Sequence, residues 1–119
     1  MTAKALKSPP TPQAPRHLEP ATRAWWRQVA RAYELEPHHF RLLALAGEAW
    51  DRGTAARVAI VEHGLTFIDR FGAPHARPEV AIERDSRIAF ARLIRELDLD
   101  VDPPAEQRRA PAIVSNRRN

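Results

Sequence analysis

The sequence predicts a mainly α-helical fold with three helices, one short β-hairpin between the second and the third helix, and a disordered tail at each end. Two patterns lead to this prediction. Apolar residues recur at helical spacing in three stretches that each begin at a proline, and a β-type run with a Gly-Ala-Pro turn separates the last two stretches. Prolines also crowd both ends of the chain, where they disfavour helices and sheets. We therefore expect one folded domain over residues 18–99, a basic, Pro-rich arm over 1–17 and a basic tail over 100–119.

The composition of the chain excludes several classes of protein. The 119 residues contain no cysteine, which rules out disulfides, a thiolate nucleophile and a cysteine-ligated zinc site. No stretch approaches the roughly 18 apolar residues of a membrane span, and no apolar segment follows the first lysines as in a signal peptide. The sequence therefore predicts a soluble, intracellular protein without a membrane partner.

The first helix is predicted to begin at Pro20 and to run to about Leu35. Four residues at helical spacing form its buried stripe: Trp26, Val29, Ala30 and Tyr33. Arg23, Arg27 and Arg31 are four residues apart and share another face, which could follow a phosphate backbone. Two other interpretations stay open. The arginines form a solvated face, or they make salt bridges across a subunit boundary with acids such as Glu79, Glu83 or Asp85.

The second helix is predicted to run from Pro37 to about His63, which is long for a chain of this size. Its apolar positions form two adjacent rows. The first row is Leu43, Gly47, Trp50, Thr54, Val58 and Val61, and the second row is Leu42, Leu45, Ala49, Gly53, Ala56 and Ile60. Because a small three-helix body cannot easily cover both rows, we expect part of this helix to contact another subunit. Gly47 and Gly53 are costly in a helix and are expected to allow a close helix approach or a bend.

A hairpin over about residues 65–77 is predicted next. Gly64 is suited to end the preceding helix, and Pro78 begins a third helix that extends to about Asp98. Two i,i+4 ion pairs are expected on the third helix: Glu83–Arg87 and Arg92–Glu96. An isolated hairpin is marginally stable, so this one should rest on a helix or pair with a neighbouring copy. The candidate residues for contact between copies are Leu42, Leu45, Ile60, Phe67 and Ile68.

The positive charge of the chain lies at its two ends. Residues 1–19 and 101–119 each carry a net charge of +2, which accounts for the whole +4, and the middle of the chain is neutral. Basic arms on a neutral body suit a polyanion, and solubilising, disordered ends are the alternative. The candidate DNA-binding residues are Lys4, Lys7, Arg16, Arg23, Arg27, Arg31, Arg108, Arg109, Arg117 and Arg118.

Sequence motifs for catalysis are missing. The chain contains no Gly-rich phosphate loop with its lysine and no Gly-x-Ser-x-Gly elbow, and its serines are Ser8, Ser86 and Ser115. His38 and His39 are adjacent and point to different helix faces, so they cannot form the i,i+4 clamp of a helical zinc site. We therefore expect a protein that is not an enzyme and that uses no metal and no cofactor.

Five segments, taken in order, carry a resemblance to a known family. They are residues 17–26 (HLEPATRAWW), 40–50 (FRLLALAGEAW), 64–66 (GLT), 77–85 (RPEVAIERD) and 93–99 (LIRELDL). In this order the chain resembles the small terminase subunits of tailed double-stranded DNA bacteriophages over about residues 17–99. It departs from the family pattern at Arg77, where members often have asparagine before the proline, and at residues 100–104, which replace a Thr-Pro-Ser-Ser ending.

The resemblance implies a non-catalytic factor for viral genome packaging. Small terminases assemble as oligomeric rings, recognise the packaging start on phage DNA and recruit the large terminase subunit, which supplies the ATPase and the nuclease. For this chain it implies double-stranded phage DNA, the large subunit and further copies of itself as partners, in the cytoplasm of a bacterial host. Two alternatives from the residues remain open: a generic DNA-binding or regulatory helical protein, and a helical protein-interaction scaffold with no role on DNA.

Overall fold

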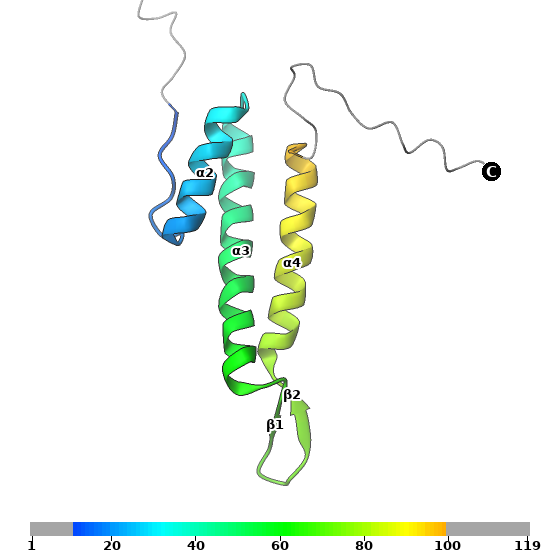
Figure 1. The fold of residues 1–119 in the computed structure, drawn as a ribbon. Coiled ribbons are helices and arrows are strands. Elements are labelled where there is room, and N and C mark those ends of the chain that lie inside the picture. The colour runs from blue at the N-terminus through cyan, green and yellow to red at the C-terminus, as the bar shows by residue number, and fades with distance from the viewer. Residues whose placement is uncertain (1–10, 100–119) are drawn as a thin grey trace, which may run out of the picture.

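The expected mainly helical fold is confirmed by the structure, a computed structural model that describes residues 11–99. α3 lies between α2 and α4, α4 runs antiparallel to α3, and the hairpin projects beyond the end that α3 and α4 share (Figure 1). The expected disorder of residues 1–10 and 100–119 lies outside the described residues. The elements are α2 (Pro20–Ala32), α3 (Pro37–His63), β1 (Thr66–Ile68), β2 (Pro74–Ala76) and α4 (Pro78–Leu97).

Proline sets the start of each of these helices. Pro20, Pro37 and Pro78 stand in the first turn of their helices, as predicted, where a missing N–H costs no hydrogen bond. The residue before each proline is extended, because the proline ring clashes with a preceding residue in helical conformation.

α2 ends at Ala32, earlier than the predicted end near Leu35. Tyr33 has extended backbone angles, φ −126° and ψ 152°, and its N–H closes the last turn of the helix. The next helix begins at Pro37, which keeps Glu36 extended and leaves only a short connection in which the chain can reverse. The prediction of a longer helix was therefore wrong, because the start of α3 limits the end of α2.

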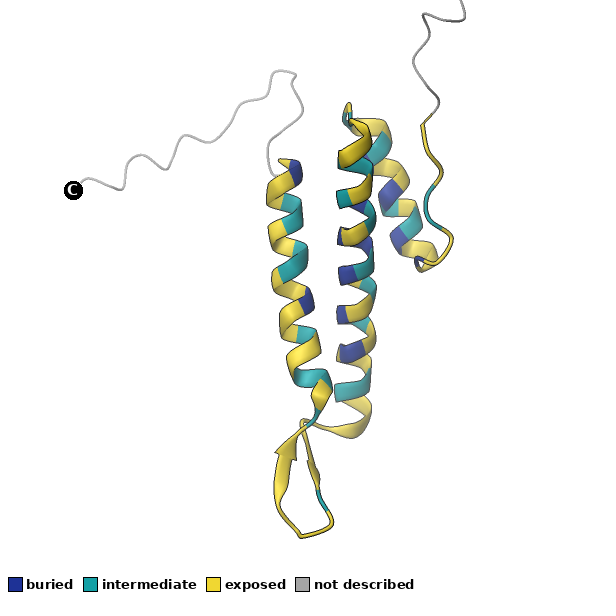
Figure 2. Cartoon of the chain, turned by 180° about the vertical axis from the view of Figure 1, so that it is seen from behind, coloured by how far each residue is buried: buried dark blue, intermediate teal, exposed yellow. Residues whose placement is uncertain are grey.

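The hairpin has no helix behind it. β1 and β2 pair antiparallel with Phe67 opposite His75, and the N–H of Arg77 donates to the carbonyl of Leu65 at 2.9 Å, so pairing spans the predicted residues 65–77. Every residue of both strands is exposed (Figure 2). We expected the hairpin to rest on a helix or to pair with a neighbouring copy. No helix of the described chain supports it, and pairing with a neighbouring copy stays a prediction.

The core lies where α2 packs against the first half of α3 and where α4 ends. Trp26 and Leu43 are its largest fully buried side chains. Five buried residues form the cluster: Leu18, Trp26, Val29, Leu43 and Leu97. The buried positions of α3 lie on its faces toward its two neighbours, while its outer face is exposed (Figure 2).

The second apolar row of α3 faces α4. Ala49, Gly53 and Ala56 of this row are buried. A Cβ atom at Gly53 would lie 3.3 Å from the Cβ of Ser86 on α4, and Ser86 is itself buried. Small residues at this contact let the two long helices approach closely, as predicted from Gly53.

The first apolar row of α3 is only half covered. Leu43 and Gly47 are buried, and a Cβ atom at Gly47 would lie 2.9 Å from Leu18 Cδ1 and 3.1 Å from Thr22 Cγ2. Gly47 therefore admits the start of α2 into close contact with α3. Trp50 is half-exposed beside the start of α2. Beyond the span of α2 the row runs into solvent, and Val58 and Val61 are exposed.

Polar contacts attach the start of α2 to α3. The carboxylate of Asp51 accepts hydrogen bonds from the hydroxyl of Thr22 at 2.6 Å and from the backbone N–H of Glu19 at 2.9 Å. One turn earlier on α3, Glu48 lies 2.8 Å from the ring of His17. Asp51 thus satisfies an N–H donor at the start of α2, which lacks a partner within the helix.

Residues 11–17, part of the arm predicted to be disordered over 1–17, are mostly exposed and contact the folded domain at a few points. Ala14 contacts the core cluster, and the N–H of Leu18 bonds to the carbonyl of Pro15 at 3.4 Å. The prolines of this segment do prevent regular secondary structure, as expected. They do not prevent packing, because the buried Leu18 fixes the end of the segment against α3.

We expect Gly64→Ala to destabilise the junction between α3 and the hairpin by about 1–3 kcal/mol. Gly64 has φ +88° and ψ −179°, a conformation that is nearly restricted to glycine, and nothing lies within 4 Å of an added Cβ. The loss would thus come from the backbone alone. Urea unfolding of the wild type and the variant measures it, and equal free energies of unfolding would contradict the assignment.

Candidate functional site

Four of the ten candidate DNA-binding residues line one groove. Arg16, Arg23, Arg27 and Arg31 face a groove of about 470 Å³ between residues 11–16 and α2. The other six candidates lie outside the described residues: Lys4, Lys7, Arg108, Arg109, Arg117 and Arg118. Helical spacing predicted the three arginines of α2 as a set, whereas the presence of Arg16 beside them depends on the path of the chain before the helix.

Arg23 differs from the other arginines of the groove. It is half-buried, and its guanidinium donates hydrogen bonds to the carbonyls of Arg16 at 3.1 Å and of Leu18 at 3.2 Å. Arg27 and Arg31 are exposed. The predicted face of three equivalent arginines is thus divided in the structure, since Arg23 holds the preceding segment against α2 while Arg27 and Arg31 face solvent.

The groove is lined on the described chain without any acidic residue. Within residues 11–99, no carboxylate lies at ion-pair distance from the guanidinium groups of Arg16, Arg27 or Arg31. Trp26 also lines the groove, and its buried indole N–H has no hydrogen-bond acceptor among these residues. The groove therefore gathers positive charge and donors, which is the chemistry that an anion requires.

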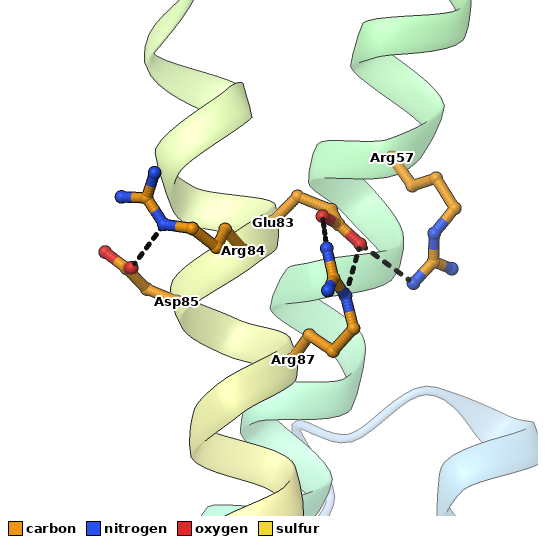
Figure 3. A network of polar contacts seen from close by, with 5 residues as sticks. All are labelled: Arg57, Glu83, Arg84, Asp85 and Arg87. Carbon is orange, nitrogen blue, oxygen red and sulfur yellow. Dashed lines mark hydrogen bonds and ion pairs between the residues drawn. The ribbon is translucent and has the colours of Figure 1, made fainter.

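Two of the three acids that could pair with α2 arginines across a subunit boundary, Glu83 and Asp85, already have partners within the chain. Glu83 accepts a hydrogen bond from Arg87 at 2.8 Å and lies 3.7 Å from Arg57 on α3 (Figure 3). Asp85 lies 3.2 Å from Arg84. The hydrogen bond from Arg87 lowers the pKa of the Glu83 carboxyl, and the charges of Arg87 and Arg57 lower it further. The predicted Glu83–Arg87 pair is thus confirmed.

Two other acids of α4 behave differently. Arg92 and Glu96, the second expected pair, do not meet at ion-pair distance in the described structure, and both residues are exposed. Glu79 is half-buried, and its Oε1 has no hydrogen-bond partner among the described residues.

The five candidate residues for contact between copies fall into different environments. Leu42 packs against the core of a single copy, and Ile60 is half-buried. Leu45, Phe67 and Ile68 are exposed. Phe67 and Ile68 are adjacent on β1 and point to opposite faces of the hairpin, so one neighbouring surface cannot cover both.

Several other exposed apolar residues were not among the predicted contact residues. Val61 and Phe71 are 81% and 82% exposed, and Leu65 is 60% exposed. Together with Val58 and Ile68 they make up what we call the distal apolar surface, at the hairpin end of the molecule. The signal in the sequence was the first apolar row of α3, which continues past the length that α2 can cover.

Three aromatic rings meet on the other half of α3. Phe90 of α4 lies 5.1 Å from Trp50 of α3 and 5.8 Å from Trp25 of α2, measured between ring centroids. With Ala21 and Thr22 they enclose an apolar hollow of about 260 Å³. The rings connect α2 with α4 across α3, so their role within one copy is structural.

The hairpin turn is closed by one carboxylate. Asp69 accepts hydrogen bonds from the backbone N–H groups of Phe71 at 2.8 Å and Ala73 at 2.9 Å, and its second oxygen lies 2.7 Å from the ring of His75. The N–H of Ala73 lowers the pKa of Asp69 most, followed by the contacts with His75 and Phe71. An aspartate at the start of a glycine-containing turn is the sequence signal that could have identified this residue.

Within residues 11–99, no three His, Asp or Glu side chains are gathered as a metal site would require. None of the helices there combines the length and the apolar character needed to cross a lipid bilayer.

Comparisons of the chain with protein-family models, with curated proteins and with solved structures find no match.

The contacts of Asp69 predict a hairpin that weakens in acid. Folding lowers the pKa of the Asp69 carboxyl. The contribution of its contacts to the stability of the hairpin is therefore fully present above the ordinary carboxyl pKa of about 3.9, and it is lost as the pH falls through the lowered pKa. We expect the amide NMR signals of Phe71 and Ala73 to change as the pH falls below about 4.

Asp69→Asn is the matched variant for this titration, since it keeps the shape of the side chain and removes its charge. Its Phe71 and Ala73 signals should be insensitive to pH over the same acid range. A wild-type titration that persists in Asp69→Asn would show that another group closes the turn.

Proposed function

We propose that this chain is a non-catalytic, DNA-binding subunit of the small-terminase type. In this role it assembles as a closed ring of identical copies, binds phage DNA at the packaging start and recruits or regulates a large terminase subunit that supplies ATPase and nuclease activity. The order of its sequence segments supports the family, and the surfaces of the folded chain support assembly and binding of a polyanion.

The observation that carries the proposal is the distal apolar surface. Val61, Leu65, Ile68 and Phe71 are each at least 60% exposed, and they follow one another from the last turn of α3 through the junction to the end of β1 and the hairpin turn. A series of exposed apolar residues at one end of a molecule marks a surface that a partner covers. The hairpin also has no helix behind it, and a pair of strands alone in water is marginally stable. A second copy would cover the apolar side chains and support the strands together.

Binding of DNA is supported by the distribution of charge. Both ends of the chain carry net positive charge, and the arginine groove adds a basic site on the folded domain. A polyanion that contacts several basic sites, each of which binds weakly, gains affinity from their number. A ring would repeat each site in every copy.

Ile68→Glu and Phe71→Glu should each convert the native assembly into smaller species. A carboxylate on the distal apolar surface would be buried without a partner in the contact between copies, which costs several kcal/mol. Native mass spectrometry of the full chain at micromolar concentration measures the number of copies. Ala91→Glu is the control, because Ala91 is exposed on α4 close to Arg87 and Arg95 and its variant adds the same charge outside the distal surface.

The same preparations test the DNA role through fluorescence anisotropy with a labelled duplex. The proposal requires a closed ring for the wild type and for Ala91→Glu, and binding of duplex DNA by that ring. A wild type that is a folded monomer at micromolar concentration, or a ring that does not bind duplex DNA, would overturn it.

A further inference from the structure

We propose that the groove between residues 11–16 and α2 binds the phosphate backbone of duplex DNA, with Arg16, Arg27 and Arg31 as the phosphate-binding residues and Arg23 as a positioning residue. This inference rests on the proposed function, and it assigns the DNA contact of the folded domain to one surface and to named side chains.

The three phosphate-binding residues form no ion pair in the described chain, and two acids, Glu34 and Glu36, belong to an adjoining hollow that Arg31 also lines. Arg57, Arg84 and Arg87, by contrast, each lie within ion-pair distance of Glu83 or Asp85 (Figure 3). An arginine that is neutralised by a neighbouring carboxylate contributes little to attracting a polyanion. The arginines of the groove form no such ion pair, and a guanidinium suits a phosphate because two parallel N–H groups can bind two oxygens.

The spacing of the groove arginines suits a repeated anion. Arg27 and Arg31 are one helical turn apart, which is about 6 Å along the axis of α2. Each strand of duplex DNA presents one phosphate per about 3.4 Å of its axis, so the two side chains can reach neighbouring phosphates of one strand. Arg16 approaches the same groove from the opposite wall, the segment that precedes α2.

Arg23 holds in place the segment that forms this second wall. Its guanidinium bonds to the carbonyls of Arg16 and Leu18, so it fixes the backbone from which the Arg16 side chain extends. A guanidinium that donates to two carbonyls has fewer N–H groups left for a ligand, although its charge remains in the groove. It therefore acts on the ligand mainly through the position of Arg16.

The groove also lies apart from the distal apolar surface. The segment before α2 runs on the side of α2 that faces away from α3, and the hairpin lies at the far end of α3 (Figure 1). A copy seated on the distal apolar surface would leave the groove open. Contact with DNA and contact between copies can therefore be changed separately by substitution.

The test compares two double variants of the full chain. Arg27→Gln/Arg31→Gln removes two charges from the groove, and Arg92→Gln/Arg95→Gln removes two exposed charges from α4. Affinity for a labelled duplex is measured over a series of salt concentrations. Each lost phosphate contact makes the slope of log affinity against log salt shallower by about 0.9, so we expect a change of about 1.8 for the groove variant and little change for the α4 variant. Arg16→Gln should change the slope by about 0.9.

Native mass spectrometry of each variant accompanies the titrations. If the wild type binds no duplex, the proposed function and this inference both fail. If the wild type binds and the groove variant keeps its slope, or if both double variants lose the same amount, the inference fails while the proposed function stands. Loss of the ring in the groove variant before any loss of DNA affinity would instead assign these arginines to contacts between copies, and it would also overturn the inference.

A final measurement separates the DNA backbone from a free anion of the same chemistry. The melting temperature of the wild type and of the groove variant is measured with sodium phosphate and with sodium chloride at equal ionic strength. Phosphate stabilises folded proteins generally, so we expect it to raise the melting temperature of the two proteins equally, because single anions lack the repeated contacts of a strand. Specific stabilisation of the wild type by inorganic phosphate, without duplex binding, would show a small-anion site and contradict the inference.

Discussion

The attachment of α2 to α3 through Asp51 and Gly47 is the constraint on which the rest of the structure depends. α2 has 13 residues, a length at which an isolated helix is marginal in water, so it needs the packing that α3 provides. Gly47 admits the start of α2, and both carboxylate oxygens of Asp51 are used there, one by the Thr22 hydroxyl and one by a backbone N–H. Because Arg23 ties residues 11–16 to this helix, the same attachment also positions one wall of the arginine groove.

The sequence predicted the elements of the fold well because their boundaries depend on local chemistry. Proline starts each described helix, and Gly64 ends α3 with a positive φ that few other residues adopt. The end of α2 and the path of residues 11–17 depend instead on contacts between segments. α2 stops early because Pro37 must begin the next helix, and Ala14 reaches the core because the burial of Leu18 anchors the residues before it. Neither of these two features can be predicted from helical spacing or from proline content.

The candidate site was predicted in part, for a similar reason. Helical spacing placed Arg27 and Arg31 on one exposed face. It could not separate Arg23 from them, because the partners of Arg23 are backbone carbonyls, and carbonyls carry no signal in the sequence. Arg16 joins the groove only through the path of the chain before α2. The two apolar rows on α3 were likewise correct as a pattern, whereas the length of α2 decides which part of the first row is exposed.

The difference in length between α2 and α3 links the fold to the proposed assembly. At 1.5 Å per residue, the 13 residues of α2 span about 20 Å and the 27 residues of α3 span about 40 Å, so α2 can cover only half of the first apolar row. The uncovered half leads directly into a hairpin that no helix supports within the described chain. A longer α2 would bury this row within one copy and remove the reason for a partner. The short α2 instead places the arginine groove at one end of the molecule and leaves the apolar surface at the other, so that in the proposed assembly copies would join through the hairpin end while every groove stays open.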